Sequence, residues 1–320
     1  MNFIYCLDDN YNVQCNISVY SLLENTDIKI NIYIIHKTKD SPVFFNKKIM
    51  NHKNLDSIKV YKFENEVKDF PNLIDSHVSE ATYYRLFIED YLPEDIDELI
   101  YLDADVVLIN PIGNRFADIF KDIKSSDYIV CAKTEIPRNE YSIELFDNLE
   151  MTTDKYFNAG VLFINYSEWL NQSVQSELID KFYKYHGTLR FWDQDILNSY
   201  FDGNYLELPE ELNKVANLYY GCDSENIETI QNFNDNFLIH YAGKHKPWTI
   251  VGILSYMSNV YHDLYFEIFQ KRYHLIVKNR LNSLKVFKQS LKDKSFFNVK
   301  NKLTFLYYFI IQIFKPKRNK

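Results

Sequence analysis

The sequence contains little glycine, proline or cysteine. Among 320 residues there are only seven glycines and eight prolines, which excludes a low-complexity chain and long flexible linkers. The four cysteines are too few for a disulfide framework, and none is paired with another at metal-ligand spacing. We therefore expect a reducing compartment. Hydrophobic residues make up 46%, which suffices for a substantial core in one large domain, with or without an appendage.

Long hydrophobic runs are also missing. The apolar stretch 3–7 meets Asp8 and Asp9 at once, so the N-terminus lacks the pattern of a signal peptide. Residues 303–314 are apolar but too short to span a bilayer. Together with the cysteine usage, these features predict a cytoplasmic protein.

The two signs of charge are unevenly distributed. Residues 271–320 hold 14 Lys and Arg and one acid, a net charge of +13, whereas residues 1–270 carry a net charge of −21. An acidic body is a poor binder of nucleic acid, so we expect no nucleic-acid partner. Aromatic and aliphatic residues alternate with lysines in the tail, a composition typical of helices that lie on an anionic membrane surface. We expect a peripheral location at the inner face of the membrane; docking of the tail on the acidic body is the alternative.

Apolar segments of strand length alternate with helical patterns along the first 165 residues. A helix is expected over 80–91, with Ser79 as its N-cap. The predicted strands are 2–7, 29–36, 57–63, 97–102, 128–133 and 157–164. This alternation predicts an α/β fold with a mostly parallel sheet. In such a sheet the ligand lies beyond the carboxyl ends of the strands.

Asp103-Ala104-Asp105 stands where one of these strands ends. The segment 99–108 reads Leu-Ile-Tyr-Leu-Asp-Ala-Asp-Val-Val-Leu, so two carboxylates follow four apolar residues. Carboxylate oxygens suit Mn²⁺ or Mg²⁺, which bridges to the phosphates of a substrate. An isolated Asp-x-Asp is often only a solvated loop. The buried strand that precedes Asp103-Ala104-Asp105 favours a metal site.

Asp8-Asp9-Asn10-Tyr11 follows the first predicted strand. The sequence is equally compatible with a turn that caps the next helix and with a nucleoside pocket. In the second case a carboxylate accepts a hydrogen bond from a base N–H and Tyr11 offers a stacking face.

Two later segments place polar side chains beside predicted elements. Asn158 and Gly160 stand at the start of a strand, where the glycine serves close packing and the amide can bind a hydroxyl. Trp192-Asp-Gln-Asp195 precedes a helical pattern, so Asp193 is either its N-cap or a ligand for sugar hydroxyls, with Gln194 beside it.

The segment 237–248 is an apolar strand that leads into His240. A single histidine in such a place is more often a buried core residue. Here Gly243 and Lys246 follow it. A histidine nitrogen for a metal, a glycine turn for close approach to phosphate and a lysine for its charge form a metal–diphosphate site.

As an ordered set, these segments resemble the retaining glycosyltransferases of family 8, among them bacterial lipopolysaccharide α-galactosyltransferases and glucosyltransferases. They keep the order of the family between about residue 2 and residue 250. The matching segments are Asp8-Asp9-Asn10-Tyr11, Thr82-Tyr-Tyr-Arg-Leu86, Tyr101-Leu-Asp-Ala-Asp105, Tyr156-Phe-Asn-Ala-Gly-Val161, Asp193-Gln-Asp-Ile-Leu197 and His240-Tyr-Ala-Gly243 with Lys246-Pro-Trp248.

The resemblance implies a GT-A type fold, a Rossmann-like mixed and mostly parallel sheet flanked by helices, with Mn²⁺ or Mg²⁺ and a UDP-hexose donor. The implied metal ligands are Asp103, Asp105 and His240. The implied contacts to the donor nucleotide are Asp8, Asn10, Tyr11, Asp103, Ala104, Asp105, His240, Gly243 and Lys246. The implied contacts to the donor sugar are Arg85, Asp103, Asn158, Asp193 and Gln194. One departure from the family is Lys244-His245, where relatives often carry smaller residues.

The expected activity is metal-dependent transfer of galactose or glucose, with retention, to a hydroxyl of a glycan or glycolipid in surface polysaccharide or lipooligosaccharide synthesis. Gln194 and Asp193 are the expected catalytic residues, and the resemblance favours departure and attack on one face of the sugar. We expect a catalytic domain over 1–260 and a basic aromatic helical region over 261–320. A self-glycosylating primer protein like glycogenin and a non-catalytic protein that binds sugar nucleotides are the alternatives.

Overall fold

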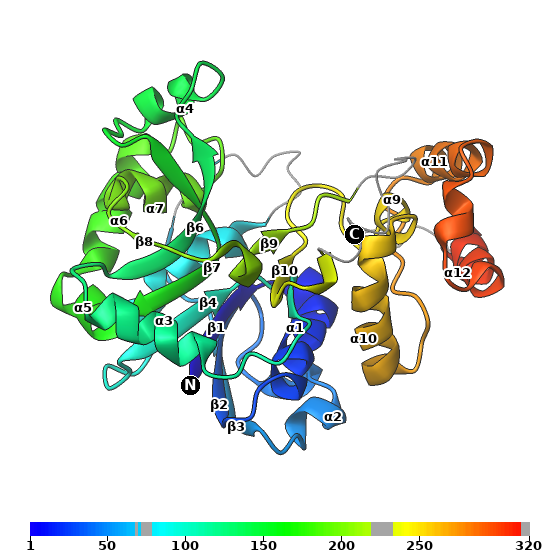
Figure 1. Cartoon of the computed structure of the whole chain (residues 1–320), viewed down its shortest axis with the longest axis horizontal. Coiled ribbons are helices and arrows are strands. Elements are labelled where there is room, and N and C mark those ends of the chain that lie inside the picture. The colour runs from blue at the N-terminus through cyan, green and yellow to red at the C-terminus, as the bar shows by residue number, and fades with distance from the viewer. Residues whose placement is uncertain (68–69, 72–78, 219–232, 315–320) are drawn as a thin grey trace.

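A seven-stranded sheet runs through the centre of the protein (Figure 1). The structure, a computed structural model, describes residues 1–67, 70–71, 79–218 and 233–314. The strand order is β3-β2-β1-β4-β7-β6-β8. Four of these strands, β3, β2, β1 and β4, run parallel, β7 is antiparallel to both β4 and β6, and β8 is parallel to β6. The mixed, mostly parallel sheet predicted from the sequence is therefore confirmed.

The predicted strands are all present, with ends that differ by a few residues. The strands of this sheet are β1 (Asn2–Leu7), β2 (Ile30–His36), β3 (Leu55–Lys62), β4 (Glu98–Leu102), β6 (Val130–Pro137), β7 (Lys155–Asn165) and β8 (Leu206–Glu207). The cysteines in the described part of the chain, Cys6, Cys15 and Cys131, are free thiols. Cys222 lies outside the described residues.

The helix expected over 80–91 differs in type. It is a 3-10 helix, η3 (Glu80–Asp90), with a non-helical residue at Phe87. Ser79 caps it as predicted, because its side chain accepts a hydrogen bond from the backbone N–H of Ala81. The side chain of Arg85 donates to the carbonyl of Thr82 and turns toward the sheet edge.

Helices cover both faces of the sheet, because alternate strand residues point to opposite sides. Phe3 and Tyr5 of β1 pack in one core cluster, and Ile4 between them packs in the other. The first face is covered by α1 (Asn12–Glu24), α3 (Arg115–Lys124) and α10 (Asn259–Phe269). The second face is covered by η3, α4 (Ile143–Asn148), α5 (Tyr166–Asn171), α6 (Val174–Tyr185) and α7 (Asp193–Phe201).

A second, three-stranded sheet was not expected from the sequence. It has the order β5-β10-β9 and consists of β5 (Val106–Leu108), β10 (Leu238–His240) and β9 (Lys214–Val215). The strand leading into His240 was predicted and is β10, although it ends at His240. Strands of two or three residues carry too little periodicity to reveal β9 or the pairing of the three strands. The short elements elsewhere are η1 (Asp9–Tyr11), η2 (Pro42–Phe44), α2 (Lys47–Met50), η4 (Glu210–Leu212) and η5 (Tyr256–Ser258).

The last helices lie at the end of the molecule away from the sheet (Figure 1). These are α9 (Ile250–Ile253), α11 (Arg280–Lys292), η6 (Ser295–Asn298) and α12 (Lys302–Phe314). They share a small hydrophobic cluster of their own, in which Leu254 and Tyr273 pack with Phe305 and Phe309. Within the described residues, every helix is too short or too polar to cross a membrane.

Candidate functional site

The ends of three neighbouring strands meet at one edge of the large sheet. β1 and β4 run parallel, so Asp8 and Asp103 follow them at the same edge. β7 runs antiparallel to β4, with Val161 opposite Leu102. Its amino end, which carries Asn158, therefore reaches that edge as well. A pocket of about 510 Å³ lies there, a volume typical of small-molecule sites.

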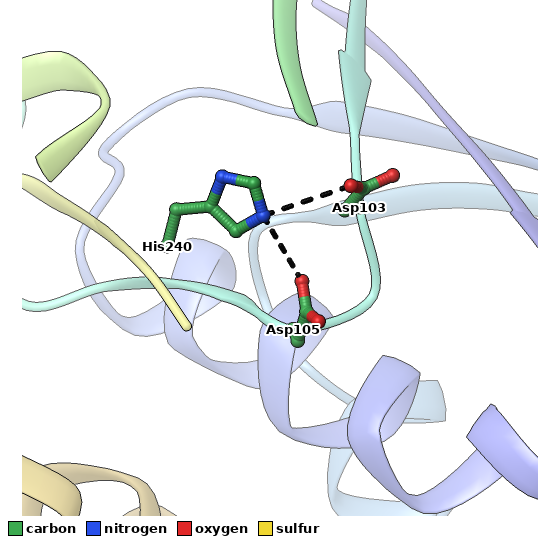
Figure 2. Close-up of side chains that lie close together, drawn as sticks. All are labelled: Asp103, Asp105 and His240. Carbon is green, nitrogen blue, oxygen red and sulfur yellow. Dashed lines mark ion pairs between the residues drawn. The ribbon is translucent and has the colours of Figure 1, made fainter. Parts of the chain in front are cut away.

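Asp103, Asp105 and His240 come together in this pocket, as Figure 2 shows. The Nε2 atom of His240 lies 3.6 Å from Oδ2 of Asp103 and 3.4 Å from Oδ1 of Asp105. One donor atom from each residue lies within 4.8 Å of the others. The antiparallel pairing of β10 with β5 places His240 opposite Val106, beside the two aspartates.

The chemistry of this cluster fits a divalent cation. Asp105 is buried, and its Oδ1 has no hydrogen-bond partner among the described residues. Its Oδ2 accepts a hydrogen bond from Nζ of Lys246 at 2.5 Å. Burial disfavours the charged carboxylate, but the ammonium group of Lys246 acts in the opposite direction, and the pKa of Asp105 lies below its usual range. An ionised, unpartnered oxygen beside a second carboxylate and an imidazole is a donor set for Mn²⁺ or Mg²⁺.

Arg85 connects the candidate metal-ligand side of the pocket, formed by Asp103, Asp105 and His240, to its other side. Its guanidinium lies 2.8 Å from Oδ1 of Asp103 and 2.7 Å from Oδ2 of Asp193, and it donates to the carbonyl of Ala159 at 2.5 Å. The ring of Tyr101 lies under it, 3.9 Å from the guanidinium carbon. Because all these partners are acceptors or an aromatic face, the buried guanidinium is fully compensated.

Asp193 begins α7 but does not cap it. Trp192, with φ of +54°, occupies the N-cap position, and its side chain does not cap the helix. The carboxylate of Asp193 instead faces Arg85 and accepts a hydrogen bond from the hydroxyl of Thr82. Burial raises the pKa of Asp193 to about 6, although Arg85 and Thr82 act in the opposite direction. The capping alternative for Asp193 is therefore wrong.

Gln194 and Asn158 meet at a carboxylate that the sequence analysis missed. Oε2 of Glu135 accepts hydrogen bonds from Nδ2 of Asn158 at 3.1 Å and from Nε2 of Gln194 at 3.2 Å. The carbonyl oxygen of Gln194 accepts from the backbone N–H of Ala159 at 2.9 Å. Glu135 belongs to β6, whose sequence gives no sign that this position faces the pocket.

Asn213 is a second residue that the sequence analysis missed. It is buried between β10 and β7, where it contacts the side chains of both His240 and Asn158. It belongs to the unremarkable polar segment 210–214, so no local signal could have identified it.

The segment after β1 caps the next helical turn, and part of it also lines the pocket. Asp8 accepts hydrogen bonds from the backbone and the side chain of Asn10, at 2.9 and 3.1 Å, and so caps η1. Asp8 and Tyr11 also line the pocket. Asn10 is exposed and is not among the residues that line it. Tyr11 packs edge-on against Trp248, with ring centroids 5.9 Å apart.

Gly243 and Lys246 line the pocket beside the candidate metal-ligand cluster, as does Ala104. Nζ of Lys246 donates to Asp105 and to the carbonyl of Tyr241. Lys244, part of the departure from the family pattern, is exposed to solvent. The predicted site residues thus lie around one pocket, with Asn10 at its periphery.

Comparisons with known proteins agree with this geometry. The profile of glycosyl transferase family 8 matches residues 2–251. A lipopolysaccharide 1,2-glucosyltransferase of Escherichia coli is 31% identical over 270 residues, which cover 81% of this chain and 77% of the relative. A putative glycosyltransferase of Haemophilus influenzae is 30% identical over 261 residues, covering 78% and 73%.

The fold also has a counterpart among solved structures. The galactosyltransferase LgtC, solved in complex with donor and acceptor sugar analogues, superposes with a TM-score of 0.60 at 20% identity. The match covers 88% of this chain and all of LgtC. At this identity the likeness shows the fold, and it confirms the predicted GT-A architecture. With the family profile matching residues 2–251, this chain is a glycosyltransferase that belongs to glycosyl transferase family 8.

Proposed function

We propose that this protein transfers a hexose, galactose or glucose, from a UDP-sugar to a hydroxyl of a glycan or glycolipid, with retention at the anomeric carbon. The observation that carries the proposal is the convergence of Asp103, Asp105 and His240 at the sheet edge beside Lys246. Relatives that act on lipopolysaccharide support a role in surface polysaccharide or lipooligosaccharide synthesis.

The diphosphate binds on the side of the pocket formed by His240, Gly243 and Lys246. Asp103, Asp105 and His240 are the residues that would hold Mn²⁺ or Mg²⁺, which supplies positive charge against the leaving diphosphate. Lys246 adds a second positive charge there. Gly243 has φ of +75°, and among the described residues nothing beyond its chain neighbours lies within 4 Å of an added Cβ, so its backbone is open to a phosphate oxygen. Asp8 and Tyr11 face the nucleoside.

The hexose binds between Arg85, Asn158, Asp193 and Gln194. The carboxylate of Asp193 accepts hydrogen bonds from sugar hydroxyls, while Arg85 holds it in place. The bond from the anomeric carbon to the diphosphate breaks, and the bond to the acceptor oxygen forms on the same face. The acceptor proton passes to the departing phosphate oxygen. Gln194 lies at the sugar and stabilises the developing positive charge through its carbonyl, without a covalent intermediate.

Donor hydrolysis and transfer assays test this function directly. UDP release from UDP-glucose and UDP-galactose is measured with Mn²⁺, with Mg²⁺ and with EDTA. Asp105→Asn should lower turnover at least about 100-fold, because it weakens a metal ligand. Asp118→Asn, an exposed aspartate on α3, is the matched control and should leave turnover unchanged. Full activity in EDTA would contradict the metal-dependent function.

The two alternatives give different results in the same experiment. A self-glycosylating protein gains the mass of a hexose on intact mass spectrometry when incubated with the donor and no acceptor. A non-catalytic binding protein binds UDP but releases none from the donor. The complete set of candidate metal ligands in this chain favours catalysis.

We also propose that the C-terminal helices attach the enzyme to the inner face of the membrane. α10 crosses residue 260 and packs in the main core, which supports placing the end of the catalytic unit at Phe269 and treating residues 271–320 as the tail. On α12, Phe305 and Phe309 face inward. The other face exposes apolar residues at helical spacing: Leu303, Tyr307, Ile310, Ile311 and Phe314. This face suits the headgroup region of a membrane.

The charge of the tail indicates which lipid it prefers. Residues 271–320 carry a net charge of +13, and each Lys or Arg near an anionic leaflet contributes about 1 kcal/mol. Part of this charge is compensated within the protein, because Arg272 and Lys300 form ion pairs with Asp263 of α10. The basic residues 315–318 lie outside the described part of the chain. An anionic surface beside a glycolipid acceptor is the partner that fits.

Co-sedimentation with vesicles tests the attachment. The protein should pellet with phosphatidylglycerol vesicles, stay in solution with phosphatidylcholine vesicles, and be released by salt. The combined change Leu303→Ser, Tyr307→Ser and Ile310→Ser should abolish pelleting. Val43→Ser with Tyr141→Ser, which alters strongly exposed apolar residues elsewhere, is the control and should pellet normally. Equal pelleting of both variants would reject the membrane role and leave the transferase activity untouched.

A further inference from the structure

Asn213 occupies a buried position between the two sides of the pocket. It follows η4, and its backbone N–H donates to the carbonyl of Glu210 at 3.1 Å. β9 begins at the next residue and pairs in parallel with β10, where Val215 lies opposite His240. The side chain is 1% exposed. A backbone hydrogen bond of Asn213 itself and strand pairing directly after it therefore fix where the amide group lies.

The amide of Asn213 forms one hydrogen bond to each side of the pocket. Its Oδ1 lies 3.3 Å from Nδ1 of His240, and its Nδ2 donates to Oδ1 of Asn158 at 3.1 Å. An amide oxygen only accepts hydrogen bonds, so Nδ1 of His240 carries the proton. In the neutral imidazole, which is the form that binds a metal, Nε2 then keeps its lone pair, and this is the atom that faces Asp103 and Asp105.

The orientation of these amides follows from groups that have only one role. Oδ1 of Asn158 accepts from the backbone N–H of Gly160 at 3.0 Å, and its Nδ2 donates to the carboxylate of Glu135. An N–H cannot accept and a carboxylate cannot donate, so Asn158 cannot be reversed. A reversed Asn213 would place its oxygen against the oxygen of Asn158. The chain of hydrogen bonds from Glu135 to His240 thus has one consistent direction.

We propose that Asn213 is a positioning residue that fixes the tautomer of His240, with Nε2 presented to the metal, and couples this ligand to Asn158 on the sugar side. The proposal rests on the proposed function, since it requires a divalent cation at Asp103, Asp105 and His240. A partner that holds the second nitrogen of a metal-bound histidine commonly contributes 10- to 100-fold, as a rough range, to metal affinity.

Two variants of the full-length protein separate the two hydrogen bonds. Asn213→Ala removes both. Asn213→Asp keeps an acceptor for Nδ1 of His240 but loses the donor to Asn158. The control is Asn236→Ala, which removes another buried asparagine close to β10 but outside the pocket. Thermal unfolding of all three variants measures the purely structural cost.

Metal affinity and histidine tautomer are the two readouts. Titration calorimetry with MnCl₂ alone should show that Asn213→Ala raises the Kd about 10- to 100-fold. Asn213→Asp and Asn236→Ala should stay within about 3-fold of the native protein. Long-range ¹H–¹⁵N spectra of labelled histidine, assigned with His240→Gln, should show the Nδ1–H tautomer in the native protein and in Asn213→Asp. Asn213→Ala should show a mixture.

The turnover of each variant tests the coupling to the sugar side. Asn213→Asp should bind Mn²⁺ well yet lower kcat, because Asn158 loses a hydrogen bond while the metal ligand keeps its own. Native metal affinity and an unchanged tautomer in Asn213→Ala would overturn the inference and leave the proposed function standing. If the native protein binds no Mn²⁺, the metal-dependent function itself fails, and the inference with it.

Discussion

Gly160 and His240 are so close that no side chain fits between them. A Cβ atom added to Gly160 would lie 2.2 Å from Cε1 of His240 and 2.9 Å from Oδ2 of Asp103. Gly160 is in β7, and the antiparallel pairing with β4 holds its carbonyl 2.8 Å from the backbone N–H of Asp103. The backbone therefore cannot retreat, and glycine at this position makes room for two candidate metal ligands.

Gly160→Ala should displace His240 or Asp103 and so disrupt the metal site. We expect turnover to fall at least about 100-fold and Mn²⁺ affinity to fall with it, since the ligands must hold their geometry closely. Steady-state kinetics and calorimetry measure the two effects. Gly187→Ala is the matched control, because in the described part of the chain nothing beyond its neighbours in sequence lies within 4 Å of an added Cβ there. Equal Mn²⁺ affinity in Gly160→Ala and the native protein would contradict this account of the site.

Arg85→Lys should preserve the charge and still impair the enzyme. Arg85 reaches Asp103, Asp193 and the carbonyl of Ala159 at once through separate nitrogens of one planar group. A lysine offers a single ammonium that cannot span these acceptors. We expect a loss of about 2–4 kcal/mol in the free energy of unfolding, since a buried carboxylate loses its partner, and a larger loss in kcat than in UDP affinity. Urea unfolding and kinetics provide the measurements, and native values for both would refute the bridging role.

The activity should have an acid limb that reports the protonation of Asp193. Burial raises the pKa of this carboxyl to about 6, so a falling pH protonates it within the working range. The protonated carboxyl no longer forms an ion pair with Arg85, and it is a weaker acceptor of hydrogen bonds from sugar hydroxyls. At saturating donor and Mn²⁺, kcat should therefore fall as the pH drops through about 6.

Thr82→Val distinguishes this limb from the pH dependence of metal binding. The hydroxyl of Thr82 donates to Asp193 and lowers its pKa. Its removal should raise that pKa and move the acid limb of kcat to higher pH. The pH profile of Mn²⁺ binding, measured by calorimetry in the same buffers, should not move. If the acid limb of kcat in Thr82→Val stayed at the pH of the native protein, a group other than Asp193 would be responsible for it.

Acid should destabilise the protein partly through His262 of α10. Burial lowers the pKa of this histidine to about 3, and its Nδ1 has no hydrogen-bond partner among the described residues. The unfolded chain binds a proton below about pH 6.5 while the folded protein does not. The free energy of unfolding therefore decreases as the pH falls from 7 toward 3. By pH 5 this histidine alone should contribute a loss of about 2 kcal/mol.

Replacement of His262 should make stability less sensitive to pH. His262→Gln retains a donor for the carbonyl of Pro247, to which Nε2 lies at 3.0 Å. Urea unfolding measures the free energy of unfolding at pH 7 and at pH 5. Between these two values it should decrease by about 2 kcal/mol less in His262→Gln than in the native protein. His186→Gln, at an exposed position on the surface, should behave as the native protein does. If the free energy of unfolding decreased equally in His262→Gln and His186→Gln, His262 would be excluded as the source of the pH dependence.

The sequence alone determined most strands of the large sheet and the first half of the site. Strands such as β1 and β4 are continuous apolar runs, and the point where polar residues replace them marks the sheet edge. For this reason Asp8, Asp103 and Asp105 were placed correctly from local pattern. The ordered motifs added the family, because several of them must occur together for the resemblance to hold.

Only the tertiary structure decided how the distant parts of the site meet. β5 and β10 have three residues each, and their pairing brings His240 to Asp105 across more than 130 residues of sequence. The contacts of Glu135 and Asn213 likewise depend on strand pairing. Hydrophobic periodicity reports which side of an element is buried, but not which residue lies opposite. Long-range hydrogen bonds and packing fix that choice, and they arise only when the whole chain has folded.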